Sequence, residues 1–448
     1  MYVALDQPWS IDRPAPVRSL ANWLLCWVFL PNVVFAWGWV VGGPARSGAV
    51  LVTAAVGVVL HRARFPLKLC GFVAALAYAA LYYIGSVFNL SIVSLVHSLK
   101  FAAELSPAAS SEYVVGALAL SAVAAAAWFR LRRSTELAGA GWMIAAAGAA
   151  CLVGAVDAHM VARNGTSWTR IPEPGAPFGS AVARSGLLAA ADGKRHMVVV
   201  MVESLGLPTD PKLRDRLVSL FARPAARARY DIAIGDTPFY GSTTSGEMRE
   251  LCGRWADYAE ILEASDPTCL PARLAARGYG TQAWHSFNGS FFDRSHWYPG
   301  IGFQQMRFAP ELLAGGAAPC PGVFTGACDR DVPRQMALAL KEARRPQFLY
   351  WLTVNSHLPV MAHARLGTDD CDRFDRDLGR QLPMVCRLFA LIDQTGAALE
   401  QEIVAKDFPP ADILIVGDHL PPFFDPQHRG AFAGDRVPWI LLRTREPG

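Results

Sequence analysis

Charged residues are scarce in this sequence. Only 18% of its 448 residues are Asp, Glu, Lys or Arg, whereas 52% are hydrophobic and the mean hydropathy is +0.23. Soluble domains typically carry about 25% charged residues, so we expect part of the chain to lie in lipid. The net charge of +4 is small and spread out, which gives no indication of nucleic-acid binding. The sequence also lacks an internal repeat, a low-complexity segment and a Cys-x-x-Cys zinc pattern.

The hydrophobic residues are concentrated in the first 160 positions. Five apolar stretches lie at about residues 19–43, 48–61, 67–97, 112–129 and 138–158. A helix needs roughly 20 apolar residues to cross a bilayer, so most of them can span it, and the second is short. The first is too long and too aromatic for a signal peptide, and further spans follow it. We therefore predict an α-helical membrane domain of five transmembrane helices over residues 1–160.

Basic residues mark alternate loops between these stretches. The loop after the second stretch contains Arg62, Arg64 and Lys68, and the loop after the fourth contains Arg130, Arg132 and Arg133. Basic loops stay in the cytoplasm, and five spans then place the rest of the chain outside it. We predict a multi-pass protein of the cell (inner) membrane with a periplasmic or otherwise extracytoplasmic domain.

The cysteines agree with this topology. Three fall in the predicted spans, and six fall in the outer part, namely Cys252, Cys269, Cys320, Cys328, Cys371 and Cys386. An even number of cysteines outside the membrane indicates disulfides. The sequence allows many pairings, of which the shortest loops favour 252–269, 320–328 and 371–386.

The outer part resembles one α/β domain. Residues 161–195, with several Pro and Gly, are predicted to be a linker, and 196–448 the domain. Strands are expected at 197–202, 229–234, 280–284, 347–353, 413–416 and 437–442. Helices are expected near 211–224, 246–252, 270–277, 330–344 and 384–404. This alternation predicts a mostly parallel sheet with helices on both faces.

Two of the predicted strands end in metal-binding side chains. The run of Met and Val at 197–202 stops at Glu203, and the run at 413–416 is followed by Asp418 and His419. Such apolar runs indicate strands buried on both faces, and ligands bind at the carboxyl ends of parallel strands. A single Glu there is most simply a solvated loop residue, but the second strand end makes a shared divalent-metal site the better interpretation.

A hydroxyl-rich loop, Gly241–Met248, precedes an apolar helical segment. Small hydroxyl residues at this place are typical of a helix N-terminus, so Thr243 or Ser245 could serve as an N-cap. A hydroxyl near a helix N-terminus and a metal can also be a nucleophile. The loop alone leaves both interpretations open.

The motifs VVVMVESLG, GSTTSGE, FLYWLTVNSHLP and ILIVGDH occur in an order that resembles the alkaline-phosphatase/sulfatase superfamily. With five preceding spans, the chain is similar to lipoteichoic acid synthases and related phosphoglycerol and phosphoethanolamine transferases. The resemblance implies an alkaline-phosphatase-like domain in which Glu203, Thr243, Asp418 and His419 bind one catalytic Mn²⁺ or Zn²⁺. It also implies that Thr243 is the nucleophile, because the family's Gly-x-Thr spacing starts from Gly241.

Further spacings refine this resemblance. Gly246, Cys252 and Gly253 follow Thr243 as in phosphoglycerol transferases that act on periplasmic glucans. The Cys-x-Pro-x-Arg or Ser-x-Pro-x-Arg motif, from which sulfatases make formylglycine, does not occur at the nucleophile loop. Its lack argues against hydrolysis of sulfate esters.

Four residues resemble the family's substrate contacts. His285, Phe292 and Arg294 match a His, an aromatic seven residues on and an Arg nine residues on that contact phosphoglycerol in lipoteichoic acid synthases. The family's aromatic is Trp, so Phe292 lacks that N–H donor. His357 matches a further His near the phosphate and could stabilise the phosphoryl group or protonate the leaving group. The structural alternatives are an Asp293–Arg294 surface ion pair and a His285 packed in the core.

The resemblance implies a membrane-anchored transferase with a ping-pong mechanism. Thr243 would take a phospho-head-group from a phospholipid, with phosphatidylglycerol preferred to phosphatidylethanolamine, and an extracytoplasmic glycan or glycolipid would accept it. A phosphodiesterase or phosphatase would use the same residues with water as the acceptor. A non-enzymatic membrane sensor is the third possibility, against which the complete Glu, Thr and Asp-His set argues.

Overall fold

The structure is a computed structural model of the 448-residue chain. It describes residues 16–36, 38–41, 43–88, 92–98, 100, 105–163, 172, 175, 177–256, 258–262, 265–423 and 425–445. The chain forms two compact units, one of residues 1–84 with 115–165 and the other of residues 85–114 with 166–448. We describe each unit by itself.

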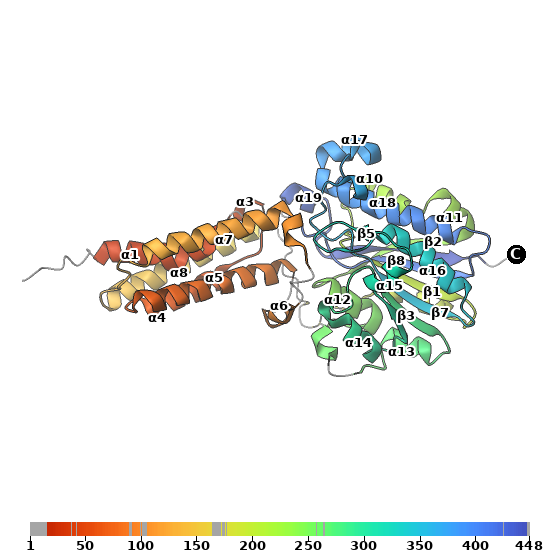
Figure 1. The fold of residues 1–448 in the computed structure, drawn as a ribbon, viewed down its shortest axis with the longest axis horizontal. Coiled ribbons are helices and arrows are strands. Elements are labelled where there is room, and N and C mark those ends of the chain that lie inside the picture. The colour runs from red at the N-terminus through yellow and green to blue at the C-terminus, as the bar shows by residue number, and fades with distance from the viewer. Residues whose placement is uncertain are drawn as a thin grey trace, which may run out of the picture. The chain divides into compact units, whose positions relative to one another are not determined.

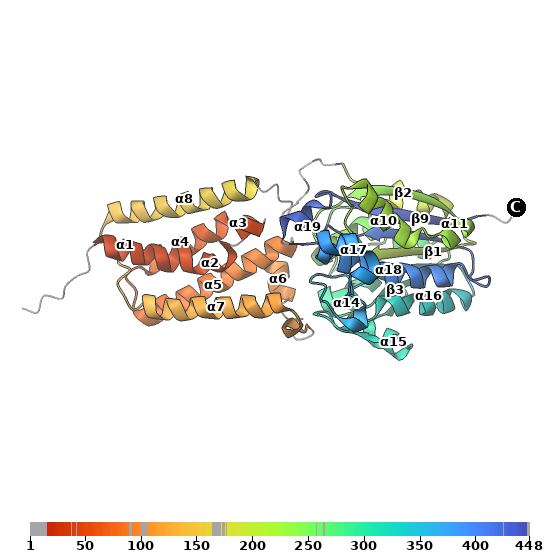
Figure 2. The same ribbon diagram turned by 90° about the horizontal axis from the view of Figure 1, so that it is seen from above.

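The first unit consists of apolar helices (Figure 2). Its helical segments are α1 (Pro16–Leu24), η1 (Leu25–Phe29), α2 (Leu30–Ala36), α3 (Gly38–Val41), α4 (Ser47–Leu60), α5 (Phe65–Phe88, whose last residues belong to the second unit), α7 (Ser111–Arg130) and α8 (Ala140–Arg163). Four helices, 16–36, 65–87, 111–130 and 140–162, are long and apolar enough to cross a membrane, and α4 is a shorter apolar helix of 14 residues. The predicted domain of apolar N-terminal helices is therefore confirmed, with four helices long enough to span a membrane and one shorter helix among the described residues. The predicted stretch 67–97 does not form one helix, because α5 ends at Phe88 and α6 (Ile92–Ser98) is separate.

A buried polar cluster lies between the helices of this unit, and the sequence patterns gave no indication of it. The Asp157 carboxylate accepts a hydrogen bond from Trp39 Nε1 at 2.6 Å and pairs with Arg46 Nη2 at 3.1 Å. Arg46 Nη1 donates to the Asn32 carbonyl oxygen at 2.6 Å. Charged groups inside a membrane domain are costly unless they are paired, so this ion pair holds α8 beside α4 and α2.

The second unit is built on a seven-stranded sheet in the order β2-β9-β8-β1-β7-β3-β4 (Figure 1). The strands are β1 (His196–Val202), β2 (Tyr230–Pro238), β3 (Gly280–His285), β4 (Gln305–Arg307), β7 (Gln347–Leu352), β8 (Ala411–Gly417) and β9 (Arg436–Thr444). From β8 to β4 all neighbours are parallel, whereas β9 is antiparallel to both β8 and β2. Strands β5 (Pro319–Cys320) and β6 (Gly326–Ala327) form a separate pair. The predicted mostly parallel sheet is confirmed.

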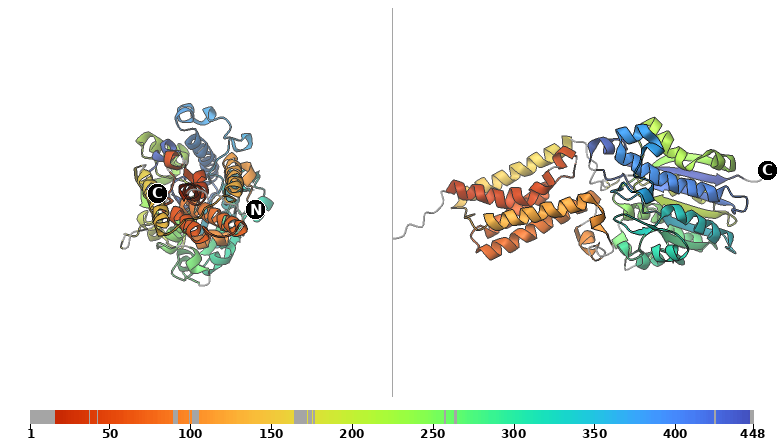
Figure 3. Two further views of the ribbon diagram at one scale, coloured as in Figure 1. Left: turned by 90° about the vertical axis from the view of Figure 1, so that its left-hand side faces the viewer. Right: turned by 45° about the horizontal axis from the view of Figure 1, so that its top comes forward.

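Helices cover both faces of this sheet, as the alternation of strands and helices predicts (Figures 1 and 3). Every residue of β1 is buried. Val198, Val200 and Val202 belong to the core that includes α10 (Pro211–Phe221), α16 (Val332–Lys341) and α18 (Pro383–Ile403). Met197, Val199 and Met201 belong to the core that includes η5 (Met248–Cys252), α13 (Leu270–Ala275) and α14 (Arg294–Gly300). A strand buried on both faces has no polar alternation, which explains the uninterrupted apolar run.

All six expected strands are present, and the differences concern short elements. The strand β4 and the helices α14, α15 (Ala309–Ala314), α17 (Asp372–Gln381) and α19 (Pro426–Gly430) were not expected. Within 161–195 the described residues include α9 (Ala181–Arg184) and η4 (Leu187–Ala190). Ala181, Val182 and Leu187 are buried in the same core as Met197, Val199 and Met201 of β1. The disulfides 252–269, 320–328 and 371–386 are formed, so the pairing favoured by the shortest loops is confirmed.

Candidate metal and nucleophile site

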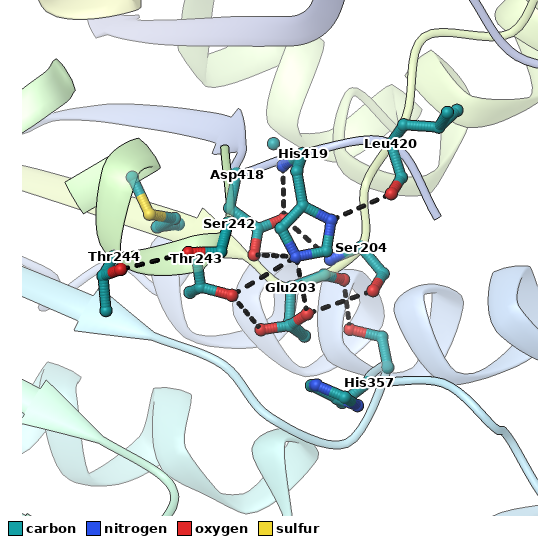
Figure 4. A network of polar contacts seen from close by, with 12 residues as sticks. Glu203, Ser204, Ser242, Thr243, Thr244, His357, Asp418, His419 and Leu420 are labelled. Carbon is teal, nitrogen blue, oxygen red and sulfur yellow. Dashed lines mark hydrogen bonds and ion pairs between the residues drawn. The ribbon is translucent and has the colours of Figure 1, made fainter. Parts of the chain in front are cut away.

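Glu203, Asp418 and His419 meet at the carboxyl ends of two neighbouring strands (Figure 4). Strands β1 and β8 run parallel with Val202 opposite Gly417, so the residues that follow them lie side by side. One ligand atom from each of the three side chains lies within 4.8 Å of the other two. His419 Nε2 is 3.3 Å from Glu203 Oε1 and 3.3 Å from Asp418 Oδ2. The sequence predicted the two strand ends, and the strand register brings them together.

Thr243 joins this cluster from the helix α12 (Thr243–Glu247). Its Oγ1 donates to Glu203 Oε2 at 3.1 Å and lies 3.3 Å from His419 Nε2. Thr244 is fully buried, and its hydroxyl lies 3.1 Å from the Ser242 hydroxyl (Figure 4). The N-cap position of α12 is occupied by Ser242, not by Thr243 or Ser245. Of the two neighbouring threonines, Thr243 is therefore the one whose hydroxyl faces the carboxylates and the imidazole.

Gly246 allows α12 to approach the metal-ligand strand. A Cβ atom at this position would lie 3.2 Å from both the Cα and the carbonyl oxygen of Asp418. That spacing is closer than side-chain carbons normally tolerate against backbone. Glycine therefore allows a close approach between α12 and the end of β8, where a side chain would force the Asp418 backbone to shift by a few tenths of an ångström.

The charges in this cluster are strongly coupled. Burial, and then the nearby Glu203, raise the pKa of Asp418 to about 7. Burial alone would raise the pKa of Glu203, but His357 and His419 hold it well below its usual range. Burial alone would lower the pKa of His419, but Asp418 and Glu203 raise it to about 9. Two buried carboxylates this close repel each other, and a positive charge between them relieves the repulsion.

The residues present fit a divalent cation. Asp418 Oδ2 is buried and makes no hydrogen bond to any of the described residues, although His419 Nε2 is nearby. Two carboxylates, one imidazole and one hydroxyl are ligand types that Zn²⁺ and Mn²⁺ accept. An unsatisfied buried carboxylate oxygen is costly unless a cation or a donor completes it. The chemistry of the site therefore matches the metal that the sequence predicts.

Ser204 orients both carboxylates, and sequence reasoning missed it. Its backbone N–H donates to Asp418 Oδ1 at 2.8 Å, and its hydroxyl donates to Glu203 Oε1 at 3.1 Å. Its φ of 57° lies in the left-handed region, which costs a non-glycine residue about 1–3 kcal/mol. Only its position directly after Glu203 could have drawn attention to it.

The loop that carries His357 is fixed from two sides. Thr353 Oγ1 accepts from the Glu203 N–H at 3.0 Å, and Ser356 Oγ donates to the Glu203 carbonyl oxygen at 2.6 Å. The buried Asp329 carboxylate accepts hydrogen bonds from the N–H groups of Val354 and Asn355, at 2.7 Å for Asn355. Figure 4 shows the His357 ring beside Glu203. Asp329 and Ser356 are positioning residues that no sequence motif singled out.

A second pair of missed residues connects the nucleophile segment with the end of β8. Arg249 is fully buried and donates to the carbonyl oxygens of Gly417 at 2.7 Å and Asp418 at 3.1 Å. Its partner Glu250 lies 2.6 Å away and accepts from the N–H groups of Ala181 and Val182 in α9. Arg249 therefore fixes the backbone of a predicted metal ligand relative to η5, which continues α12.

The predicted substrate contacts His285, Phe292 and Arg294 lie at the end of β3 and in the segment that follows it. His285 is buried with Nδ1 3.1 Å from the Leu352 carbonyl oxygen, and burial together with Arg294 lowers its pKa to about 3, so the ring is neutral. Phe292 has a φ of 54°, and the centre of its ring lies 5.5 Å from the guanidinium carbon of Arg294. The structure places these residues next to one another, and their contact with substrate stays a prediction.

Arg294 makes a different ion pair from the one expected. It is 2% exposed, and its Nη2 and Nε donate to Glu247 Oε2 at 2.8 Å and 3.0 Å. The alternative of a surface pair with Asp293 is wrong, because Asp293 pairs with Lys100 at 2.7 Å. Glu247 also accepts from the hydroxyls of Tyr298 and Tyr350. Arg294 thus holds α14 against the helix that begins with Thr243.

Comparison with known proteins supports the fold. Residues 195–445, more than half of the chain, match the model of the Sulfatase family. No curated protein sequence matches this chain. Solved structures to which the chain is similar include the lipoteichoic acid synthase LtaP from Listeria monocytogenes (17% identity, TM-score 0.45, 58% of this chain and 67% of that chain) and the Streptococcus pyogenes phosphoglycerol transferase GacH in complex with sn-glycerol-1-phosphate (19%, 0.38, 55% and 68%). A third is the C-terminal periplasmic domain of EcEptC from Escherichia coli in complex with Zn (12%, 0.37, 57% and 74%).

These structures are too distant to transfer a substrate, since one fold hosts many functions. The family match is different, because its range, residues 195–445, is more than half of the chain and includes the strands, the hydroxyl loop and the Asp-His pair. The chain therefore belongs to the Sulfatase family, and its second unit has the alkaline-phosphatase-like fold of that family.

Proposed function

We propose that this protein is a membrane-anchored, metal-dependent transferase. It moves a phospho-head-group, phosphoglycerol in the first instance, from a phospholipid to an extracytoplasmic glycan or glycolipid. The observation that carries the proposal is the position of the Thr243 hydroxyl, within 3.3 Å of both Glu203 and His419. A hydroxyl held by a metal-type ligand set is the arrangement that covalent phosphoryl transfer requires.

In this proposal Glu203, Asp418 and His419 hold one Mn²⁺ or Zn²⁺, and Thr243 approaches it. A bound cation of this kind lowers the pKa of a hydroxyl and offsets phosphate charge. Thr243 Oγ attacks the phosphorus, the bond from phosphorus to the diacylglycerol oxygen breaks, and diacylglycerol leaves with a proton. The acceptor hydroxyl then attacks the phospho-Thr243 diester, and Thr243 is released.

His357 is suited to the second step. Its Nδ1 lies 2.7 Å from the Leu358 carbonyl oxygen, which can only accept, so Nδ1 carries the hydrogen. Burial lowers the pKa of His357, which keeps the ring neutral. In that tautomer Nε2 is an acceptor and can take the proton of the incoming hydroxyl.

The donor is proposed from the spacing of His285 and Arg294, which favours phosphatidylglycerol over phosphatidylethanolamine. Because Arg294 is paired with Glu247, we assign it the role of holding α12 and leave direct phosphate contact to His285 and His357. A phosphodiesterase or phosphatase would use the same nucleophile. Only the acceptor separates these activities.

The deciding experiment incubates the full-length protein with labelled phosphatidylglycerol and phosphatidylethanolamine and then traps the intermediate by acid. The mass added to the Thr243 peptide identifies the head group. Turnover without any adduct on Thr243 would overturn the covalent mechanism. Release of free glycerol phosphate in place of transfer to a glycan would identify a hydrolase, and a chain that binds no metal and turns over neither lipid would be a sensor.

A further inference from the structure

The segment between the third and fourth predicted spans belongs to the second unit. It follows α5, which ends at Phe88, and precedes α7, which begins at Ser111, and both helices are long and apolar enough to cross a membrane. We call its described residues Lys100 and Leu105–Ser110 the strap. Residues 85–114 form part of the compact unit that contains the sheet. The strap is thus joined at both ends to predicted spans and packed on the family domain.

The first strap contact is an ion pair beside predicted substrate residues. Lys100 Nζ lies 2.7 Å from Asp293 Oδ1, and the Asp293 side chain is only 17% exposed. Asp293 stands between Phe292 and Arg294. Phe292 and Asp293 have φ values of 54° and 53°, in the left-handed region that non-glycine residues adopt only when their surroundings impose it. The strap therefore contacts a strained segment at the substrate side.

The second contact is with the loop closed by the Cys320–Cys328 disulfide. The Ser106 N–H donates to the Val323 carbonyl oxygen at 2.9 Å, and the hydroxyls of Ser106 and Thr325 are 3.4 Å apart. Phe324 lies between these two contact residues, and its ring centre is 4.0 Å from that of His357. The strap thus supports the loop that packs on a proposed catalytic side chain.

Four phenylalanines form a connected cluster near the two contacts, which we call the phenylalanine wall. Phe291, Phe292 and Phe324 are half-buried, whereas Phe287 is 2% exposed and packs against Phe291 and Phe324. Phe291 lies 4.6 Å from Phe292, 5.2 Å from Phe287 and 5.7 Å from Phe324, measured between ring centres. Phe287 and Phe324 are 5.6 Å apart. Such a wall attracts apolar groups and offers few hydrogen bonds to a sugar or to water. It suits the diacylglycerol part of a phospholipid.

The helix α6, just before the strap, also presents apolar side chains. Val93 is 79% exposed and Val96 is 49% exposed. Because α6 begins only a few residues after the apolar helix α5, exposed valines here are placed to meet lipid. The apolar wall, the strap contacts and α6 together indicate the same kind of occupant.

We propose that the strap and the phenylalanine wall form the donor side of the site, where a membrane phospholipid is received with its diacylglycerol part against the wall. This inference rests on the proposed function and deepens it by assigning the lipid side. Its consequence is selective. Use of a donor in a bilayer depends on the strap, because the strap raises the effective concentration of donor at the wall. The chemical step at the phosphodiester does not depend on the strap.

The test compares lipid and soluble donors in full-length protein reconstituted in phosphatidylglycerol-containing vesicles. Lys100→Asp places two carboxylates opposite each other at the Asp293 contact, and Lys100→Arg keeps the ion pair. Lys341, the last residue of α16, pairs with Asp407 at 2.8 Å. Lys341→Asp breaks this ion pair and serves as the matched control. Activity is measured as head-group transfer from the vesicles and as hydrolysis of bis(4-nitrophenyl) phosphate.

We expect Lys100→Asp to lower kcat/KM for the lipid about 10-fold and to leave the soluble diester within about 2-fold. Lys100→Arg and Lys341→Asp should match the wild type on both. An equal loss on both donors, or no loss on the lipid, would overturn the inference. A wild type that uses neither donor would instead overturn the proposed function on which it rests.

A labelling experiment is independent of how the variants fold. Wild-type protein is irradiated with phosphatidylglycerol that carries a diazirine on an acyl chain. We expect label on peptides that contain Phe287–Phe292 or Phe324. Label confined to the helices of the first unit would overturn the inference.

Discussion

The buried pair of Arg294 and Glu247 provides the sharpest test of how this site is held together. Family resemblance makes Arg294 a substrate ligand, whereas the structure makes it the partner of a fully buried carboxylate. Arg294→Ala would leave the buried Glu247 carboxyl group without its cationic partner, next to the hydroxyls of Tyr298 and Tyr350. Burial, and then the Glu247 charge, raise the pKa of both tyrosines, so both hydroxyls stay neutral and can only donate hydrogen bonds to Glu247.

Removing one partner of a buried ion pair costs about 3–5 kcal/mol. For a domain of this size, each kcal/mol lowers Tm by roughly 2–4 °C, so Arg294→Ala should lower it by roughly 6–20 °C. The double variant Arg294→Met with Glu247→Gln removes both charges and keeps an oxygen for the tyrosines. It should regain most of the loss, with a coupling free energy of at least about 2 kcal/mol.

The assay is thermal unfolding of the full-length protein in detergent, followed by near-ultraviolet circular dichroism. Arg445→Ala is the control, because its pair with Asp231 is half-exposed and worth less than about 1 kcal/mol. An Arg294→Ala protein that melts like the wild type but has a raised KM for the lipid would refute the reasoning. Arg294 would then be a substrate ligand first.

Four further predictions address the site, its pH dependence and the topology. Thr243→Ala should keep the metal and the fold but lower transfer at least about 10³-fold, Asp418→Ala should lose both metal and transfer, and Thr244→Ala should have a mild effect. Metal content and turnover are the measurements, and an active Thr243→Ala with an inactive Thr244→Ala would show that the nucleophile is Thr244. Ser204→Ala removes the hydroxyl that donates to Glu203 and should weaken metal binding about 10-fold, whereas unchanged affinity by isothermal titration would contradict its orienting role. Burial raises the pKa of Asp329 from 3.8 to about 6. Between these pH values the folded protein keeps a proton that the unfolded chain has released, so the contribution of Asp329 to the free energy of unfolding is largest below about pH 4. This contribution falls by about 3 kcal/mol as the pH rises through 6. Asp329→Asn should remove that slope from urea melts, and an unchanged slope would contradict it. A reporter fused after residue 165 should be active outside the cytoplasm and one near residue 65 inside, and the reverse pattern would overturn both the topology and the compartment assumed for the disulfides.

The sequence alone determined the elements whose physical signals are local. Apolar runs of about 20 residues are typical of helices in lipid or in a core. Short, fully apolar runs such as 197–202 and 413–416 are typical of strands buried on both faces. Both strands are found where they were expected, and four of the five expected spans contain a helix long enough to cross a membrane, although the third is shorter than expected because α5 ends at Phe88. Disulfide pairing also followed from sequence, because the partners are close along the chain.

Tertiary structure alone decided how side chains from distant segments share one environment. The register of β1 against β8 places Glu203 beside Asp418, 215 positions along the chain, and it selects Ser204 as their common donor. Arg294 carries the same spacing signal whether it faces a phosphate or a carboxylate, and only the packing of α14 on α12 chose Glu247. Sequence patterns report which residues are apolar or charged over a few turns, whereas the partner of a buried charge depends on contacts between segments far apart in the chain.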